Sequence, residues 1–277
     1  MQIETLVSDI YKLFDPNVTH VPNEDNLHEF AENLKELLRH RLAEREPISD
    51  PLRFSALGKP DRQLWYMAQG EKSEDLRPQT YFKFLYGDVI EQVLLFLCKE
   101  AGHSVTHEQE EVEVDGVKGH IDAKIDGVVV DVKSASPFGY KKFHDGSIVS
   151  NDPFGYIQQL SGYTNVLTPD AGGAFLAFDK VSGDICLSPV SHSITSSYPP
   201  RPRIAHLKGV ISSPTPPPRC YVDEPDGASG NRKLGTECSY CGFKHKCWDG
   251  LRTFLYSGGP RYLTVVANLP KVPELEG

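Results

Sequence analysis

The fold is decided by the stretch VEVDGVKGHIDAKIDGVVVDVKS, residues 112–134. Its β-branched residues predict strands that are separated by two Asp-Gly pairs, Asp115-Gly116 and Asp126-Gly127. Asp-Gly is a strong hairpin signal, because type I′ turns need positive φ at both central residues. We therefore predict an antiparallel meander whose three strands span Val112–Val114, Val117–Ile125 and Val128–Val132.

Two acidic side chains and a lysine are expected to meet on this meander. Asp131 and Lys133 are two residues apart on the third strand, so their side chains share one face of it. Asp122 lies on the neighbouring strand, where pairing brings it beside Asp131. Carboxylates hold a divalent metal through their oxygens, and an ammonium can orient a water or stabilise developing negative charge. The pattern predicts a metal-dependent hydrolytic site; the alternative is the solvated face of an ordinary antiparallel sheet.

The composition is that of a globular protein. The chain has 277 residues, of which 39% are hydrophobic and 24% charged, which predicts one large domain, either alone or with a small appendage. It has neither an apolar run of membrane length nor an N-terminal signal pattern, so we expect a cytoplasmic protein without a membrane partner. The formal net charge of −9 argues against coating of nucleic acid through overall charge.

Helices are predicted on either side of the meander. Apolar residues recur at helical spacing within residues 1–45 and over Thr80–Ala101, a strongly apolar segment. Glu91 lies inside that second segment, where an acid is costly unless it is paired or metal-bound. A later helix over Tyr156–Asn165 is followed by strands over Gly173–Asp179 and Asp184–Val190. The predicted order is helix, three strands, helix, strand.

Candidate DNA-binding residues lie outside these elements. Arg62 and Tyr66 combine charge with an aromatic face, a mixture suited to nucleic-acid backbone and bases, whereas the neighbouring Trp65 could equally be core. Lys141 and Lys142 lie in the segment 136–155, which is predicted to be a functional loop. A Pro-rich basic track follows over residues 198–219.

The six cysteines include a closely spaced set, Cys238-x2-Cys241-x5-Cys247. In a reduced compartment such spacing favours a metal over disulfides. Cys220 brings the number of thiol ligands to four, and His245 is an alternative ligand. This spacing is a strong signal for a metal and a weak one for which metal.

From about Arg53 to Trp248 the chain resembles the RecB-like branch of the PD-(D/E)XK nuclease superfamily, whose α/β core has the order αβββαβ. Four segments match that family's motifs in order. They are Gly87-x3-Glu91, where many members have His, then Gly119-His120-Ile121-Asp122, then Asp131-Val132-Lys133, and finally Gln159-x3-Tyr163 on one helical face.

The resemblance implies roles for these residues. Glu91, Asp122 and Asp131 would ligate Mg²⁺ or Mn²⁺, and Lys133 would position a water or offset charge. Gln159 and Tyr163 would hold the substrate backbone or support the site. His120 is either a partner of the metal ligands or a structural histidine.

The cysteine segment also looks like the iron–sulfur end of CRISPR-associated RecB-like nucleases and related helicase-nucleases. Those relatives take a fourth cysteine from the N-terminal side of the core, next to a segment like Arg62–Tyr66. Here residues 56–61 contain none, and Cys220 is the candidate replacement. A site of four cysteines from this segment suits Zn²⁺ as readily as a [4Fe–4S] cluster, and zinc is slightly favoured.

The resemblance implies a metal-dependent DNA exonuclease of DNA recombination, repair or phage DNA processing. Alternatives are a structure-specific or single-strand endonuclease, an inactive DNA-binding accessory subunit, and a zinc-stabilised interaction module. The expected partner is DNA; a recombination or single-strand-binding protein and an oligomer stay open. The predicted regions are N-terminal helices (1–48), nuclease core (49–197), Pro-rich basic linker (198–219) and cysteine segment with tail (220–277).

Overall fold

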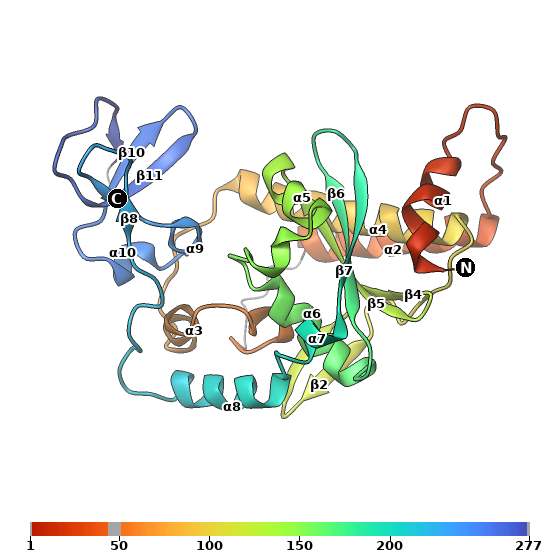
Figure 1. Ribbon diagram of the computed structural model, residues 1–277, viewed down its shortest axis with the longest axis horizontal. Helices are drawn as coiled ribbons and strands as arrows, with labels where there is room; N and C mark the ends of the chain where they lie inside the picture. Colours follow the sequence, from red (N-terminus) through yellow and green to blue (C-terminus); the bar gives the residue numbers. More distant parts are fainter. Residues whose placement is uncertain (1, 44–50, 276–277) are drawn as a thin grey trace. The chain divides into compact units, whose positions relative to one another are not determined.

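The computed structural model describes residues 2–43 and 51–275 (Figure 1). The chain forms two compact units, which we describe separately: the first comprises residues 1–58 and 76–204, the second residues 59–75 and 205–277. This grouping differs from the four predicted regions, because Arg62 and Tyr66 belong to the unit that contains the four predicted cysteine ligands. The predicted boundary at residues 48 and 49 lies outside the described residues.

The first unit is built on a mixed five-stranded sheet in the order β1-β4-β5-β6-β7. The sheet strands are β1 (Val105–Thr106), β4 (Ala123–Ile125), β5 (Val128–Ala135), β6 (Gly173–Asp179) and β7 (Ile185–Val190). The helices are η1 (Ile3–Thr5), α1 (Leu6–Lys12), α2 (Glu24–Ala43), η2 (Phe54–Ala56), α4 (Pro78–Glu100), α5 (Pro137–His144), η3 (Ser147–Val149), α6 (Tyr156–Leu167), α7 (His192–Thr195) and the first part of α8 (Pro200–Ile211).

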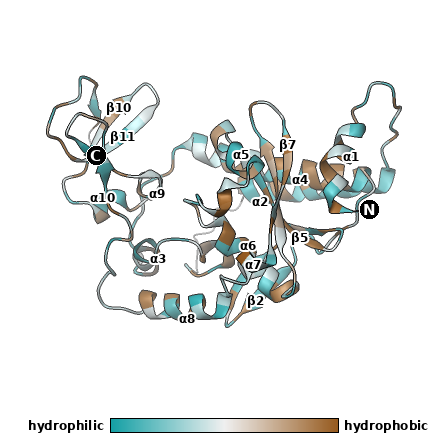
Figure 2. Ribbon diagram, in the orientation of Figure 1, coloured by the Kyte–Doolittle hydropathy of each residue, from teal (hydrophilic) through white to brown (hydrophobic). Residues whose placement is uncertain are grey.

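Strand β5 is central and is covered on both faces. It pairs antiparallel with β4 and parallel with β6, with Asp131 opposite Phe175. Val130 and Val132 pack in one core cluster with Leu94 and Leu95 of α4. The alternate residues face the other side, where Phe175 lies against Phe143 of α5 with ring centroids 5.3 Å apart. Figure 2 shows hydrophobic residues gathered in α4, α6 and these strands.

The predicted meander is wrong in one respect. Its second strand is interrupted: β3 (Val117–His120) ends before Ile121, and β4 begins at Ala123. As a result β3 and β2 (Glu111–Val114) form a separate two-stranded sheet instead of extending the main one. Both Asp-Gly turns are confirmed, since φ is +50° and +79° at Asp115 and Gly116, and +48° and +85° at Asp126 and Gly127.

The other elements of this unit mostly confirm the sequence-based prediction. The two N-terminal helices, the helix containing Glu91, the helix after residue 155 and the last two strands all lie where they were predicted. The prediction of a loop over residues 136–155 was wrong. Helix α5 occupies much of it, with Pro137 in its first turn and Ser136 Oγ accepting a hydrogen bond of 3.3 Å from Gly139 N. The predicted linker over residues 198–219 contains α8.

The second unit contains another five-stranded sheet, antiparallel throughout, in the order β12-β10-β11-β9-β8. Buried Trp65, Tyr66 and Phe243 form its aromatic cluster. Its elements are α3 (Asp61–Ala68), the rest of α8, β8 (Glu224–Pro225), β9 (Arg232–Lys233), α9 (Thr236–Ser239), α10 (Lys244–Cys247), β10 (Arg252–Tyr256), β11 (Gly259–Val265) and β12 (Glu274–Leu275). Within the described residues, no helix combines the length and the hydrophobicity needed to traverse a lipid bilayer.

A glycine pair in the first unit gives a stability test. A Cβ on Gly58 would lie 2.3 Å from Gly155 Cα, and backbone cannot yield as a flexible side chain can. We expect Gly58→Ala to lower the free energy of unfolding by about 1–3 kcal/mol through overpacking. The matched control is Gly209→Ala on α8, where the added methyl meets nothing within 4 Å and an interior helical alanine is favourable. Thermal unfolding of both variants measures this; equal melting temperatures would contradict the close approach.

Candidate active site

The predicted acidic pair lies on adjacent strands of the central sheet. Ala123 pairs with Val130, so Asp122, just before β4, lies beside Asp131 of β5. The Asp122 carboxylate reaches across, and its Oδ2 accepts a hydrogen bond of 2.6 Å from Val132 N. Burial raises the pKa of Asp122 to about 7, and the charge of Asp131 adds to the shift. The interrupted strand therefore places one carboxylate against the backbone of the next strand.

Asp131 and Lys133 share a face, as their spacing predicted. Asp131 is 2% exposed, and Lys133 forms an ion pair with its Oδ2. Neither carboxylate oxygen of Asp131 has a hydrogen-bond partner of regular geometry. Burial raises the pKa of Asp131, while Lys133 opposes the shift. Burial alone would lower the pKa of Lys133, but Asp131 and Asp122 raise it above its usual range, so this lysine is a fixed positive charge rather than a proton acceptor.

Glu91 joins these groups from helix α4. Burial raises its pKa to about 9, and the negative charges of Asp122 and Asp131 contribute further. Its Oε1 accepts a hydrogen bond of 2.8 Å from Gln109 Nε2. One turn earlier, a Cβ on Gly87 would lie 3.3 Å from Ser134 Oγ, so a small residue lets α4 approach β5 closely. The third predicted carboxyl group is thus held at the same site.

Gln159 and Tyr163 also face the site from α6. Tyr163 is buried, stacks on Phe54 with ring centroids 5.1 Å apart, and hydrogen-bonds Gln159. Burial raises its pKa above the usual range, and the charges of Asp131 and Asp122 act on it in the same direction. A Cβ on Gly119 would lie 2.9 Å from the Tyr163 hydroxyl. Gly119, of the Gly119-His120-Ile121-Asp122 motif, therefore leaves room for the hydroxyl of Tyr163.

Several residues of the site were not singled out from the sequence. Gln109 binds Glu91, and the charge of Asp88 raises the pKa of Glu91 and Asp122. Lys133 Nζ lies 4.9 Å from the centroid of the Tyr156 ring, and Asp152 acts electrostatically on Asp131. The one available signal was the position of Tyr156 at the start of the predicted helix, seven residues before Tyr163.

The donor set suits a hard divalent cation. Three carboxyl groups act on one another electrostatically, and only the ammonium of Lys133 is paired with the buried oxygens of Asp131. A bound cation would satisfy these oxygens and lower the raised pKa values, because it favours the ionised forms. Over residues 2–43 and 51–275, no group of three His, Cys, Asp or Glu side chains already stands in a geometry that could hold a metal.

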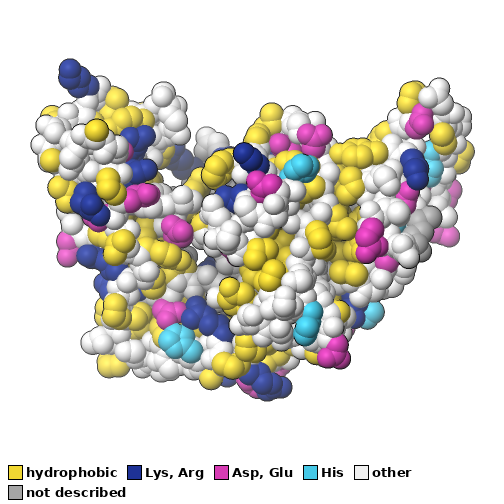
Figure 3. All heavy atoms as spheres, in the orientation of Figure 1, with side chains coloured by type: hydrophobic (Ala, Val, Ile, Leu, Met, Phe, Trp, Pro, Cys, Tyr) yellow, Lys and Arg dark blue, Asp and Glu magenta, His cyan; other side chains and the backbone are white. Residues whose placement is uncertain are grey.

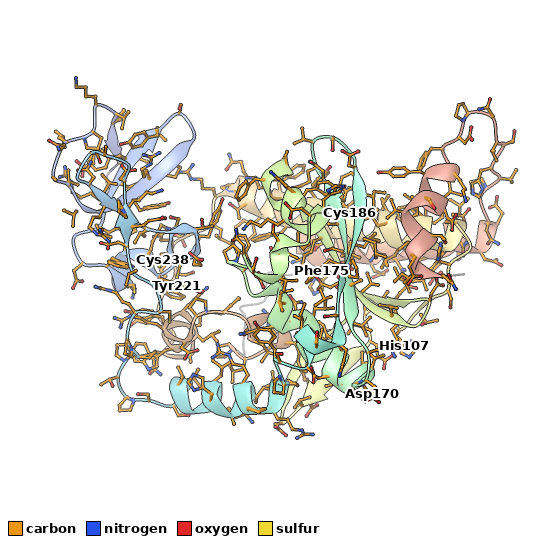
Figure 4. The ribbon with its side chains drawn as sticks, viewed as in Figure 1. His107, Asp170, Phe175, Cys186, Tyr221 and Cys238 are labelled. Carbon is orange, nitrogen blue, oxygen red and sulfur yellow. The ribbon has the colours of Figure 1, made fainter. Side chains whose placement is uncertain are left out.

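The four predicted cysteine ligands line one cavity of the second unit. It is open to solvent, and Cys220, Cys238, Cys241 and Cys247 all contribute to its lining. Tyr221 lines it too, near Cys238 in Figure 4. Burial raises the pKa of Cys238 to about 11 and also raises that of Cys241. The alternative ligand His245 instead lies against Tyr262, with ring centroids 6.1 Å apart. The thiol set fits a thiophilic metal.

The predicted DNA-binding residues of the second unit make structural contacts. Arg62 Nη1 donates a hydrogen bond of 2.6 Å to the carbonyl of Pro217. Tyr66 is 8% exposed and stacks on Phe243 with ring centroids 5.4 Å apart. The neighbouring Trp65 is buried as well. This segment packs within the cysteine-bearing unit, as the structural interpretation of Trp65 suggested.

In the first unit, Lys141 is exposed at the end of α5. Lys142 donates to Asn151 Oδ1 over 2.8 Å, which ties α5 to the segment before α6. His120 is exposed, and its Nε2 lies 3.8 Å from Glu111 Oε2. Figure 3 shows basic and acidic side chains interspersed on the visible face.

No protein-family model and no curated protein matches this chain. Solved structures that are similar to it include SSO0001, at 17% identity over 80% of this chain and 96% of that one, with a TM-score of 0.41. An alkaline exonuclease from Laribacter hongkongensis is 14% identical over 64% of this chain and 94% of that one, with a TM-score of 0.38. A phage-related exonuclease from Haemophilus somnus is 15% identical over 58% of this chain and 90% of that one, with a TM-score of 0.39. The residues of the site carry the functional argument.

The raised pKa of Glu91 predicts a pH-dependent stability of the metal-free protein. Between the ordinary value of 4.5 and about 9, the folded chain binds more protons at this position than the unfolded chain does. The free energy of unfolding therefore falls as the pH rises through this range. Glu91→Gln removes the charge and keeps an oxygen that can accept from Gln109. In EDTA at about pH 8.5 we expect this variant to melt several degrees above the wild type. The difference should shrink toward pH 5.

The control for this experiment is Glu113→Gln on the exposed face of β2. It should leave the pH dependence of the melting temperature unchanged. A stabilisation by Glu91→Gln that is the same at every pH would show that charge burial at Glu91 is not its cause.

Proposed function

We propose that the protein is a metal-dependent DNA exonuclease that hydrolyses phosphodiester bonds. The observation that carries this proposal is the buried Asp131 carboxylate, which is ion-paired with the ammonium of Lys133 and acts electrostatically on Asp122 and Glu91. Such a group of acids at a sheet, with one fixed positive charge, is costly to fold and is typical of an electrostatic catalytic site. The solvated-face alternative does not account for its burial.

The chemistry would divide among these residues as follows. Glu91, Asp122 and Asp131 would hold Mg²⁺ or Mn²⁺. When bound, the cation would polarise a phosphodiester oxygen and acidify a water. Lys133, permanently charged, would orient that water or stabilise the negative charge that develops on the phosphate. Tyr163 and Gln159 would hold the substrate backbone or support the site.

The choice of an exonuclease acting on DNA rests on the resemblance of the four ordered motifs to RecB-like nucleases. A structure-specific or single-strand endonuclease is the second candidate, since the same acids would serve it. An inactive accessory subunit is less well supported because every member of the acid and lysine set is present and gathered. A role in recombination, repair or phage DNA processing, in the cytoplasm, belongs to the same proposal.

The first test is digestion of end-labelled linear DNA and of closed circular DNA with Mg²⁺ or Mn²⁺. We expect degradation of the linear form, and a loss of more than about 100-fold in Lys133→Ala, because the fixed charge beside the reacting phosphate is removed. Lys124→Ala on β4, a neighbouring strand of the same sheet, is the matched control and should retain activity.

Each outcome of this assay has a distinct meaning. Nicking of circles would favour the endonuclease. Equal activity in Lys133→Ala and wild type would refute the assigned site. Binding of DNA without cleavage under both cations would favour the accessory subunit.

We also propose that Cys220, Cys238, Cys241 and Cys247 bind a metal, Zn²⁺ in preference to a [4Fe–4S] cluster. The four thiols line one cavity of a single unit, so the site needs no ligand from residues 56–61. Thiols with raised pKa values release protons when a metal binds, which couples the site to folding of this unit. Arg219 donates to the Cys247 carbonyl over 2.8 Å and its guanidinium lies 4.3 Å from the Trp248 ring, fixing the backbone around one ligand.

Metal analysis of protein purified without oxygen tests this site. We expect about one equivalent of zinc in the wild type and a loss of at least about half of it in Cys247→Ala, since three thiolates hold zinc less tightly than four. Cys98→Ala, at a buried thiol of α4 in the other unit, is the control and should keep its metal. Iron with visible absorption would identify the cluster instead, and metal-free wild-type protein would refute the site.

A further inference from the structure

Two lysines lie together at one end of the central sheet, and the proposed hydrolysis uses neither of them. The first is Lys83 on α4, a helix that runs antiparallel to β5. Leu94 of α4 shares a core cluster with Val132, whereas a Cβ on Gly87 would lie 3.3 Å from Ser134 Oγ, further along the strand. Lys83 is exposed and lies one turn before Gly87 on the same helical face. It is therefore placed beside the end of β5.

The second lysine, Lys180, reaches the same place from another strand. It follows directly on β6, whose Leu176 and Phe178 face the core cluster that contains α4 residues. Lys180 continues that alternation, so its side chain projects to the same side of the sheet. Its backbone N donates a hydrogen bond of 3.0 Å to the carbonyl of Ala135, the last residue of β5. Two separate elements thus bring two ammonium groups to one end of the strand that carries the catalytic lysine.

These two positive charges are not neutralised within the protein. Burial lowers the pKa of Lys180, and the charge of Lys83 lowers it further. Among residues 2–43 and 51–275, no carboxylate forms an ion pair with either lysine. Like charges held close together repel each other. A bound anion would offset this repulsion and favour the charged form of Lys180.

We propose that Lys83 and Lys180 together bind one phosphate group of the DNA strand, at a position other than the phosphate that is cut. The inference rests on the proposed function, because it needs a DNA strand at the acids. Lys83 lies about 12 Å before Glu91 along the axis of α4, at the helical rise per residue. A strand held at Glu91 reaches the lysines within a few nucleotides.

This phosphate site, formed by Lys83 and Lys180, would position the strand without reading its sequence. Lysine binds phosphate as a point charge, and contacts to phosphate carry no direct base information. The lysines would act before the chemical step, by fixing the strand relative to the acids. They are positioning residues, and their effect should appear in binding that involves no cleavage.

The test is binding of a labelled single-stranded oligonucleotide in EDTA, in which single phosphates are replaced one at a time by uncharged methylphosphonate. In the wild type we expect one position at which this replacement weakens binding about 10-fold, as for loss of one hydrogen bond to a charged group. Lys83→Gln/Lys180→Gln should bind the intact oligonucleotide about as weakly, and should show no further loss at that position. The salt dependence of its log Kd should also fall by about 0.7, the contribution of one phosphate on a single strand.

The matched control is Lys35→Gln/Lys118→Gln, which removes the same two charges from positions where Glu32 and Glu111 already pair with them. It should retain the wild-type preference for the intact oligonucleotide. Oligonucleotides with and without a terminal phosphate complete the comparison. A loss confined to the terminal phosphate would assign the lysines to the strand end, and a loss at an internal position would assign them to the backbone.

Thermal unfolding separates this role from a structural one. The melting temperature of Lys83→Gln/Lys180→Gln should be no lower than that of the wild type, because the substitutions remove a repulsion. A lower melting temperature, with binding weakened equally at every phosphate position, would refute the phosphate site.

The remaining outcomes distinguish the two proposals. If the wild type digests DNA but Lys83→Gln/Lys180→Gln binds every oligonucleotide as the wild type does, the phosphate site is refuted and the nuclease stands. If no DNA is digested with Mg²⁺ or Mn²⁺, yet one phosphate position depends on the two lysines, the phosphate site stands without the nuclease. Neither digestion nor binding would remove both.

Discussion

The first unit depends on the burial of like charges around one strand. Asp131 lies in the middle of β5, a strand covered on both faces, and Asp122 and Glu91 are gathered beside it. Desolvation raises the pKa of all three carboxyl groups, and a single ammonium opposes it. Taking charges out of water is expensive even in a good ion pair. Three neighbouring elements bring these groups together. The break between β3 and β4 places Asp122, α4 places Glu91, and α6 covers the site with aromatic rings.

Much of the fold was predictable because local signals agreed with the tertiary structure. The Asp-Gly turns need positive φ and have it, and the apolar spacing over Thr80–Ala101 matches α4 closely. The break between β3 and β4 was not predictable, since alternation continues through Ile121 and Asp122 without proline or glycine at the break. It results from contacts distant in sequence, such as Phe54 against Gly119 and Val132 against Asp122. Helix α5 did carry a signal, Ser136-Pro137, an N-cap followed by a favoured first residue.

The residues of the site likewise fall into those that the sequence could predict and those that it could not. Asp131 and Lys133 follow from a spacing of two on a strand, and Glu91 stands out as an acid in an apolar helix. Gln109 and Tyr156 could not be assigned from spacing, because their contacts depend on where separate segments cross. Arg62 and Tyr66 show the converse: charge and aromatic character suit nucleic acid and a packed interior equally, and only burial distinguishes the two.

The break between β3 and β4 also determines where the chain can accept an insertion. Since β2 and β3 pair only with each other, their turn at Asp115-Gly116 lies outside the ladder that carries the acids. The ion pair of Asp115 with Arg201, at 2.5 Å, is largely exposed and of the kind that contributes little. Lengthening a surface loop costs little, growing only slowly with added residues. The tip of this hairpin is therefore a position where an epitope or a fluorophore-bearing peptide could be inserted with the catalytic strands left intact.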